Sequence, residues 1–147
     1  MYNGKIFPLL LTSVLICSFI FHSRGMPTSI QSAPARCEFR GGIENYCSAA
    51  SSVLSTHGLF VVCENWLNND RVYDGAKKAG LHIRTVFPIK GAVRKKTNLF
   101  AIYVMEHQNE QDTKSDTKVL EPISVRKDDG KWTKEYANIM ASMSIPE

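Results

Sequence analysis

Four basic residues lie close together in the middle of the chain and could hold phosphate groups. They are Lys90, Arg94, Lys95 and Lys96. Lysine and arginine are the side chains that proteins place against nucleic-acid phosphates. No aromatic residue is interleaved with them for base stacking, and the tip of a solvated hairpin would have the same composition. Two interpretations therefore stay open, a nucleic-acid contact and an exposed hairpin tip.

The glycines form no recognisable phosphate-binding loop. None of the nine glycines belongs to a G-x-G-x-x-G pattern, the usual cradle for a dinucleotide or S-adenosylmethionine. Gly75 and Gly80 have phosphate-loop spacing, but Leu81-His82 stands where Lys-Ser/Thr is required. No H-E-x-x-H, G-x-S-x-G or zinc-type cysteine spacing is present. The sequence therefore predicts no catalytic, cofactor-binding or metal-binding residue.

Glu64 and Asn65 follow the apolar run 59–63, at the carboxyl end of a predicted strand. Open α/β sheets bind ligands at that end. Because no phosphate loop accompanies these residues, we interpret Glu64 as a loop acid and Asn65 as a residue that starts a helix.

The elements that must position these residues alternate between helix and strand. Apolar residues at helical spacing predict a helix over about 43–56, ended by Gly58, and a second helix up to Gly80. Apolar or alternating runs predict strands, and a proline marks a short edge strand. These strands cover residues 59–63, 81–87, 99–105 and 119–125, and Thr133 can cap a last helix. This order is typical of an α/β sheet.

The first 25 residues differ from the rest. Sixteen uncharged, mostly apolar residues run from Ile6 to Phe21, fewer than the roughly 20 of a spanning helix. They fit the hydrophobic helix of a signal peptide, a short membrane anchor, or a misassigned start upstream of the domain. Residues 26–36 are polar and interrupted by prolines, which indicates a linker before a domain at 37–147.

The length and the net charge of the chain limit its possible functions. A chain of 147 residues with 44% hydrophobic and 22% charged residues suits one folded domain. The net charge of +4 is too small to indicate a nucleic-acid binder by itself.

Several segments together resemble one family, the small-domain methyltransferases of the bacterial tRNA(Val) adenine-N6 type. The likeness is to the later half of that family and covers about residues 35–141. It rests on ARCEFRGGIENYC (35–47), LSTHGLFVVC (54–63), Asn98-Leu99, VLEPISV (119–125) and DDGKWTKEY (128–136).

The resemblance implies the carboxyl-terminal part of a Rossmann-like class I sheet that uses S-adenosylmethionine to methylate a nucleobase. Residues 59–63 then correspond to the fifth strand, 81–87 to the sixth and 99–105 to the antiparallel seventh. The family's glycine-rich turn and N-P-P-Y motif should precede Arg36 and are not found there. We therefore expect a partial methyltransferase that binds no S-adenosylmethionine and is inactive alone.

Three further expectations concern partners and location. Without a fourth strand, residues 59–63 should expose an apolar edge and favour oligomers or aggregates. The alternative function is a membrane-tethered, non-enzymatic α/β module that binds RNA or protein through residues 90–96. The resemblance implies a cytoplasmic protein, whereas an operating leader in residues 6–21 implies a membrane or secreted one.

Overall fold

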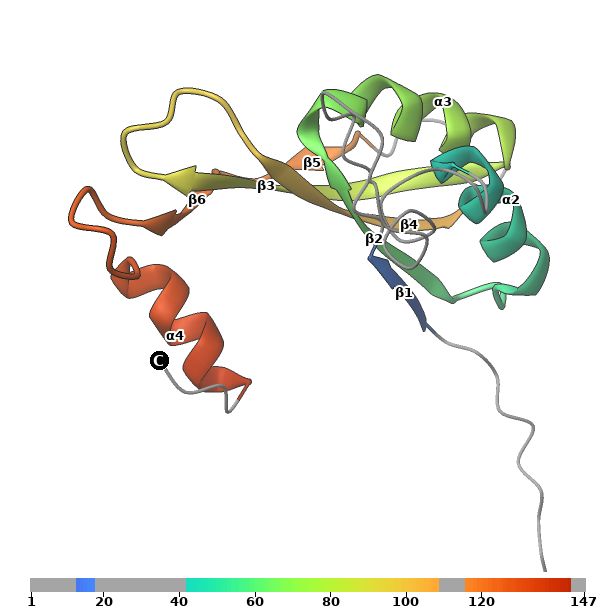
Figure 1. The fold of residues 1–147 in the computed structure, drawn as a ribbon. Coiled ribbons are helices and arrows are strands. Elements are labelled where there is room, and N and C mark those ends of the chain that lie inside the picture. Colours follow the sequence, from blue (N-terminus) through green and yellow to red (C-terminus); the bar gives the residue numbers. More distant parts are fainter. Residues whose placement is uncertain (1–12, 18–41, 109–115, 144–147) are drawn as a thin grey trace, which may run out of the picture.

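The computed structural model describes residues 13–17, 42–108 and 116–143. It contains a six-stranded mixed sheet with helices on both faces (Figure 1). The helices are α2 (Ile43–Val53), α3 (Asn69–Lys78) and α4 (Lys134–Ser142), and a short 3-10 helix η2 (Trp66–Asn68) precedes α3. The strands are β1 (Ser13–Cys17), β2 (Leu59–Asn65), β3 (Leu81–Ala92), β4 (Phe100–His107), β5 (Lys118–Val119) and β6 (Ile123–Arg126).

The strand order confirms the predicted α/β fold. The sheet reads β1-β2-β4-β3-β5, and β6 also pairs with β3. β4 runs antiparallel to both β2 and β3, so these two strands are parallel to each other. The strands predicted as fifth, seventh and sixth therefore lie side by side in that order, with the antiparallel strand in the middle.

The amino-terminal apolar run departs from the prediction. Ser13–Cys17 forms a strand, not part of a hydrophobic helix, and pairs in parallel with Leu59–Cys63 of β2. A short apolar run does not distinguish helix from strand by periodicity, and the open edge of β2 offers it backbone hydrogen bonds. Residues 1–12 and 18–36 of the predicted leader and linker lie outside the described residues.

Pairing with β1 also corrects the expectation of a bare edge on β2. β1 occupies that edge, so among the described strands β1 forms one edge of the sheet, and β5 and β6 form the other. Association through a strand edge stays a prediction. None of the helices in the described part of the chain is both long and apolar enough to span a membrane.

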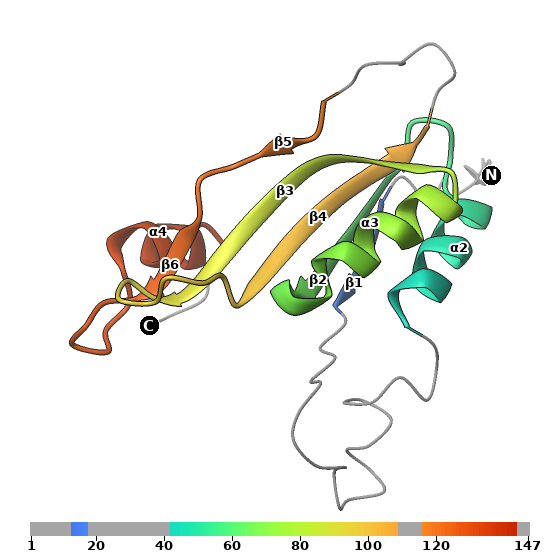
Figure 2. The same ribbon diagram turned by 90° about the horizontal axis from the view of Figure 1, so that it is seen from above.

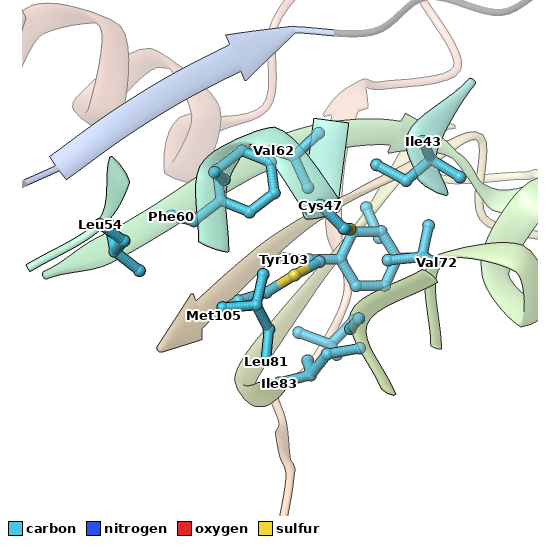
Figure 3. Packing of buried hydrophobic residues seen from close by; sticks show 14 residues of the cluster. Ile43, Cys47, Leu54, Phe60, Val62, Val72, Leu81, Ile83, Tyr103 and Met105 are labelled. Atoms are coloured by element: carbon cyan, nitrogen blue, oxygen red, sulfur yellow. The ribbon is translucent and has the colours of Figure 1, made fainter. Parts of the chain in front are cut away.

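The core lies between the sheet and the pair α2 and α3. One stripe of α2 is buried, and the inward residues of β2 alternate with half-buried ones. Figure 3 shows side chains of both helices meeting Tyr103 and Met105 of β4. The residues fully shielded from solvent in this layer include Ile43, Cys47, Phe60, Val62, Val72, Ala101, Tyr103 and Met105.

Two glycines were predicted to end helices, and one of them does so in the expected way. Gly80 has φ +69°, the left-handed conformation that ends α3. Gly58 has no positive φ, and α2 already ends at Val53. A Cβ on Gly58 would lie 2.8 Å from the Leu54 side chain, so close packing accounts for this glycine.

The carboxyl-terminal segments add two short strands to the sheet beside β3 and a helix on its other face (Figure 1). The predicted strand 119–125 is split by Pro122 into β5 and β6, both parallel to β3. The Thr133 side chain accepts a hydrogen bond from the backbone N of Tyr136 and caps α4, as predicted. Figure 1 shows α4 on the opposite face from α2 and α3.

Candidate functional site at the carboxyl edge of the sheet

Three parallel strands end at one edge of the sheet. β1 ends at Cys17, β2 at Asn65 and β3 at Ala92, and Cys17 is the register partner of Cys63. Figure 2 shows the ends of β1 and β2 and the turn from β3 into β4 along the same side of the sheet. Open α/β sheets bind ligands outside this edge. It is therefore the place to look for a site.

Glu64 is fully buried near the end of β2, so its interpretation as a loop acid was wrong. The strand extends to Asn65, and its alternation turns position 64 toward the helix layer. Glu64 Oε1 accepts hydrogen bonds from the backbone N of Asn65 at 2.8 Å and from Nδ2 of Asn68 at 3.0 Å. Oε2 has no hydrogen-bond partner among the described residues.

Asn65 starts a helix, as predicted. Its side-chain Oδ1 accepts a hydrogen bond from the backbone N of Leu67 at 3.0 Å and caps η2. Together with Glu64, it fixes the path of the chain from β2 into α3.

Tyr103 of β4 connects α3 to the sheet. Its hydroxyl donates a hydrogen bond to Oδ1 of Asn69 at 3.0 Å, and its ring packs edge-on to that of Tyr73, with centroids 6.5 Å apart. Burial raises the pKa of Tyr103, and the nearby Tyr73 and Glu64 raise it further. The hydroxyl therefore stays protonated at neutral pH. These contacts anchor the start of α3 to the sheet.

The basic cluster is divided between a strand and a turn. Arg94, Lys95 and Lys96 are exposed in the turn between β3 and β4, whereas the half-buried Lys90 lies within β3 and pairs with Ser124. The hairpin tip is thus shorter than predicted, because β3 continues to Ala92. Among the described residues no ion pair involves any of the four.

The two described connections at the carboxyl ends of the strands do not contain a glycine-rich cradle of the kind that holds S-adenosylmethionine. β2 leads into η2 and β3 leads into the basic turn, and neither connection is rich in glycine. The described part of the chain also holds no cluster of three or more His, Cys, Asp or Glu residues suited to a metal ion. We therefore assign no catalytic step to a bound cofactor.

A second basic turn, residues 126–132, was missed by the sequence analysis. The backbone N of Val93 donates a hydrogen bond to the carbonyl O of Arg126 at 2.8 Å, which joins this turn to the β3–β4 turn. A groove of about 430 Å³ lies against it. It is lined by Arg126, Lys127, Lys131 and Trp132. Basic residues flanking a tryptophan were the available signal, but their sequence position gave no reason to place them near residue 94.

The comparisons with known proteins support only the fold. No protein-family model matches the sequence, and no curated protein matches it either. Among solved structures, the chain is similar to a predicted O-methyltransferase, protein Atu636 from Agrobacterium tumefaciens, with a TM-score of 0.57 and 8% sequence identity. That match covers 92% of this chain and 53% of the other.

Two structures of M1.HpyAVI also match, at lower similarity. The complex with SAM has a TM-score of 0.36, 8% identity and coverage of 56% of this chain and 49% of that one. The other has a TM-score of 0.34, 8% identity and coverage of 70% and 83%. Likenesses this low support no conclusion. The chain spans about half the length of the O-methyltransferase, and it has the α/β fold of a methyltransferase-like sheet.

Proposed function

We propose that this chain is the carboxyl-terminal part of a S-adenosylmethionine-dependent methyltransferase that acts on nucleic acid, of the tRNA adenine-N6 type. One observation carries the nucleic-acid part of the proposal. The exposed Arg94, Lys95 and Lys96 lie at the edge of the sheet where its parallel strands end. Cations at that edge would hold a polyanionic substrate where such folds bind their ligands.

The charges in this turn are available for phosphate contact. Their side chains are exposed, and no described acidic residue forms an ion pair with them. The turn itself is held by backbone hydrogen bonds, from Lys95 N to Ala92 O at 3.0 Å and from Leu99 N to Ile89 O at 2.7 Å. A turn fixed in this way presents its cations without first having to become ordered.

We do not propose that the chain alone binds the methyl donor. In the complete family S-adenosylmethionine supplies the methyl group. We propose that the chain by itself binds no S-adenosylmethionine and is inactive.

RNA binding by the full chain tests the substrate class. We expect the triple variant Arg94→Gln, Lys95→Gln, Lys96→Gln to bind single-stranded RNA roughly tenfold or more weakly in a filter assay at low salt. The slope of log K against log salt should become less steep by about two to three. The control removes three exposed lysines elsewhere, Lys77, Lys78 and Lys118. Equal retention of RNA by both variants would discard the nucleic-acid substrate.

Calorimetry of the full chain with S-adenosylmethionine tests the donor part. We expect no saturable heat, and binding in the micromolar range would show that the chain holds its own donor.

A non-enzymatic module that binds RNA through the same turn is the second candidate. The exposed cations of the turn, which form no ion pair with described acidic residues, support it because phosphate contact needs no methyl donor. The DNA upstream of Met1 separates the two candidates. A reading frame that encodes a glycine-rich turn and an N-P-P-Y motif supports the methyltransferase, and a stop codon directly upstream supports the binding module.

A further inference from the structure

We infer that the nucleic-acid surface extends from the β3–β4 turn onto the second basic turn, residues 126–132, and that Trp132 stacks against one base of a single strand. The inference rests on the proposed nucleic-acid function, because it assigns more of the same surface. It adds an aromatic contact that the basic residues 90–96 do not contain.

The two turns form one surface because the backbone joins them. Ala92 and Arg126 are register partners at the ends of β3 and β6, and Val93 N donates to Arg126 O at 2.8 Å. Residues more than thirty positions apart in the sequence are thereby held side by side. Figure 1 shows the two turns next to each other, at the far end of the sheet from α2.

The second turn is built rigidly. Lys127 N donates to the carbonyl O of Lys131 at 2.8 Å, and Gly130 N donates to the carbonyl O of Lys127 at 3.1 Å. Gly130 has φ +81°, a conformation that favours glycine. The backbones of Arg126 and Trp132 form an antiparallel β-bridge. The groove beside the turn therefore exists without a ligand.

Charge is concentrated on this surface. Residues 93–99 and 126–132 together contain six basic and two acidic side chains, so they carry +4, the net charge of the entire chain. The two acids are Asp128 and Asp129, and Asp129 Oδ1 accepts a hydrogen bond from Lys131 N at 2.9 Å. Everything outside the two turns is neutral on balance. A polyanion would therefore be drawn to this end of the molecule.

Trp132 supplies what the first turn lacks. Its ring packs edge-on to Tyr136, with centroids 5.3 Å apart and planes at 89°, and it lines the groove of about 430 Å³ with Arg126, Lys127 and Lys131. Pockets that hold small ligands measure roughly 300–1,000 Å³, and the volume of this groove lies in that range. A tryptophan flanked by cations is the combination that binds a base and its phosphates. An acidic peptide would use the cations alone.

Tryptophan fluorescence tests the stacking directly. The chain has two tryptophans, so Trp66→Phe leaves Trp132 as the single reporter in the full chain. We expect a twelve-residue oligouridylate to quench its emission, and an abasic phosphodiester oligomer of equal length to bind without quenching. Quenching by neither oligomer, with RNA binding still dependent on Arg94, Lys95 and Lys96, would overturn the inference and leave the proposed function standing.

Two variants measure the contribution of the second turn. Trp132→Ala should weaken oligouridylate binding roughly tenfold, and Trp132→Phe should retain most of the affinity because a stacking face remains. Lys127→Gln with Lys131→Gln should weaken RNA and the abasic oligomer alike. Unchanged RNA affinity in these variants, or competition by polyglutamate equal to that by RNA, would contradict the inference. If the unmodified chain bound no RNA, that result would instead contradict the proposed function.

Discussion

The two faces of the sheet are packed very differently. On one face, α2 and α3 cover a continuous core in which Phe60, Val72 and Tyr103 are fully buried. On the other face, α4 has no buried residue, and an apolar cavity of about 190 Å³ lies between it and the sheet. The first face stabilises the fold, and the second carries the segment that positions the second basic turn.

This difference separates stability from the candidate function. The anchors of α3 are buried polar contacts, whereas the basic turns are exposed and held by backbone hydrogen bonds. Substitutions in the helix layer should therefore act on unfolding, and substitutions in the turns should act on binding. The following predictions test that separation.

The largest effect is expected from emptying the core. Phe60→Ala should lower the free energy of unfolding by roughly 3–5 kcal/mol, because it leaves a cavity in a fully buried layer. Ile139→Ala on α4 should cost only about 1 kcal/mol, because that helix is partly exposed. Urea unfolding of both variants measures the difference. Equal losses would show that the two faces contribute alike.

A smaller loss of stability is expected from substitutions near the starts of the helices on the two faces of the sheet. Glu64→Ala should cost about 1–3 kcal/mol, because the buried Asn68 amide would lose its acceptor. Glu64→Gln keeps an acceptor oxygen and should cost less. Thr133→Ala removes the cap of α4 and should cost about 1 kcal/mol. Thermal unfolding ranks the three, and a larger loss for Thr133→Ala would reverse the comparison.

The smallest effect concerns a surface ion pair on the helix layer. Arg71 Nε lies 2.9 Å from Glu44 Oε1, and hydrogen bonding from Arg71 holds the pKa of Glu44 below its ordinary value. Both side chains are 36% exposed, so solvent screening limits the pair to about 0.5 kcal/mol.

The pH dependence of that pair has a definite sign. Because the pKa of Glu44 is lower in the folded state, its contribution is present above the ordinary pKa of 4.5 and is lost as the pH falls through the folded value. The stability difference between the unmodified chain and Glu44→Gln should therefore shrink from pH 7 to pH 3.

The fold could be predicted from local patterns because those patterns report burial. The apolar stripe Ile43, Cys47 and Ala50 predicted a helix, and that stripe is buried. The continuous apolar runs in β2 and β4 and the rough alternation in β3 identified three strands. The amino-terminal run was assigned wrongly because a strand and a short buried helix share the same apolar composition.

By itself, the sequence determined the order of the main helices and strands from residue 43 to residue 107, the N-cap of the last helix at Thr133 and the basic character of residues 94–96, since each depends on neighbouring residues. Only the tertiary structure decided that β1 lies along β2, that Glu64 is buried, and that residues 126–132 lie beside the β3–β4 turn. The physical reason is that these contacts arise from strand pairing between distant segments. Pairing of that kind depends on backbone hydrogen bonds, which every residue except proline can donate, so no local pattern specifies the partner.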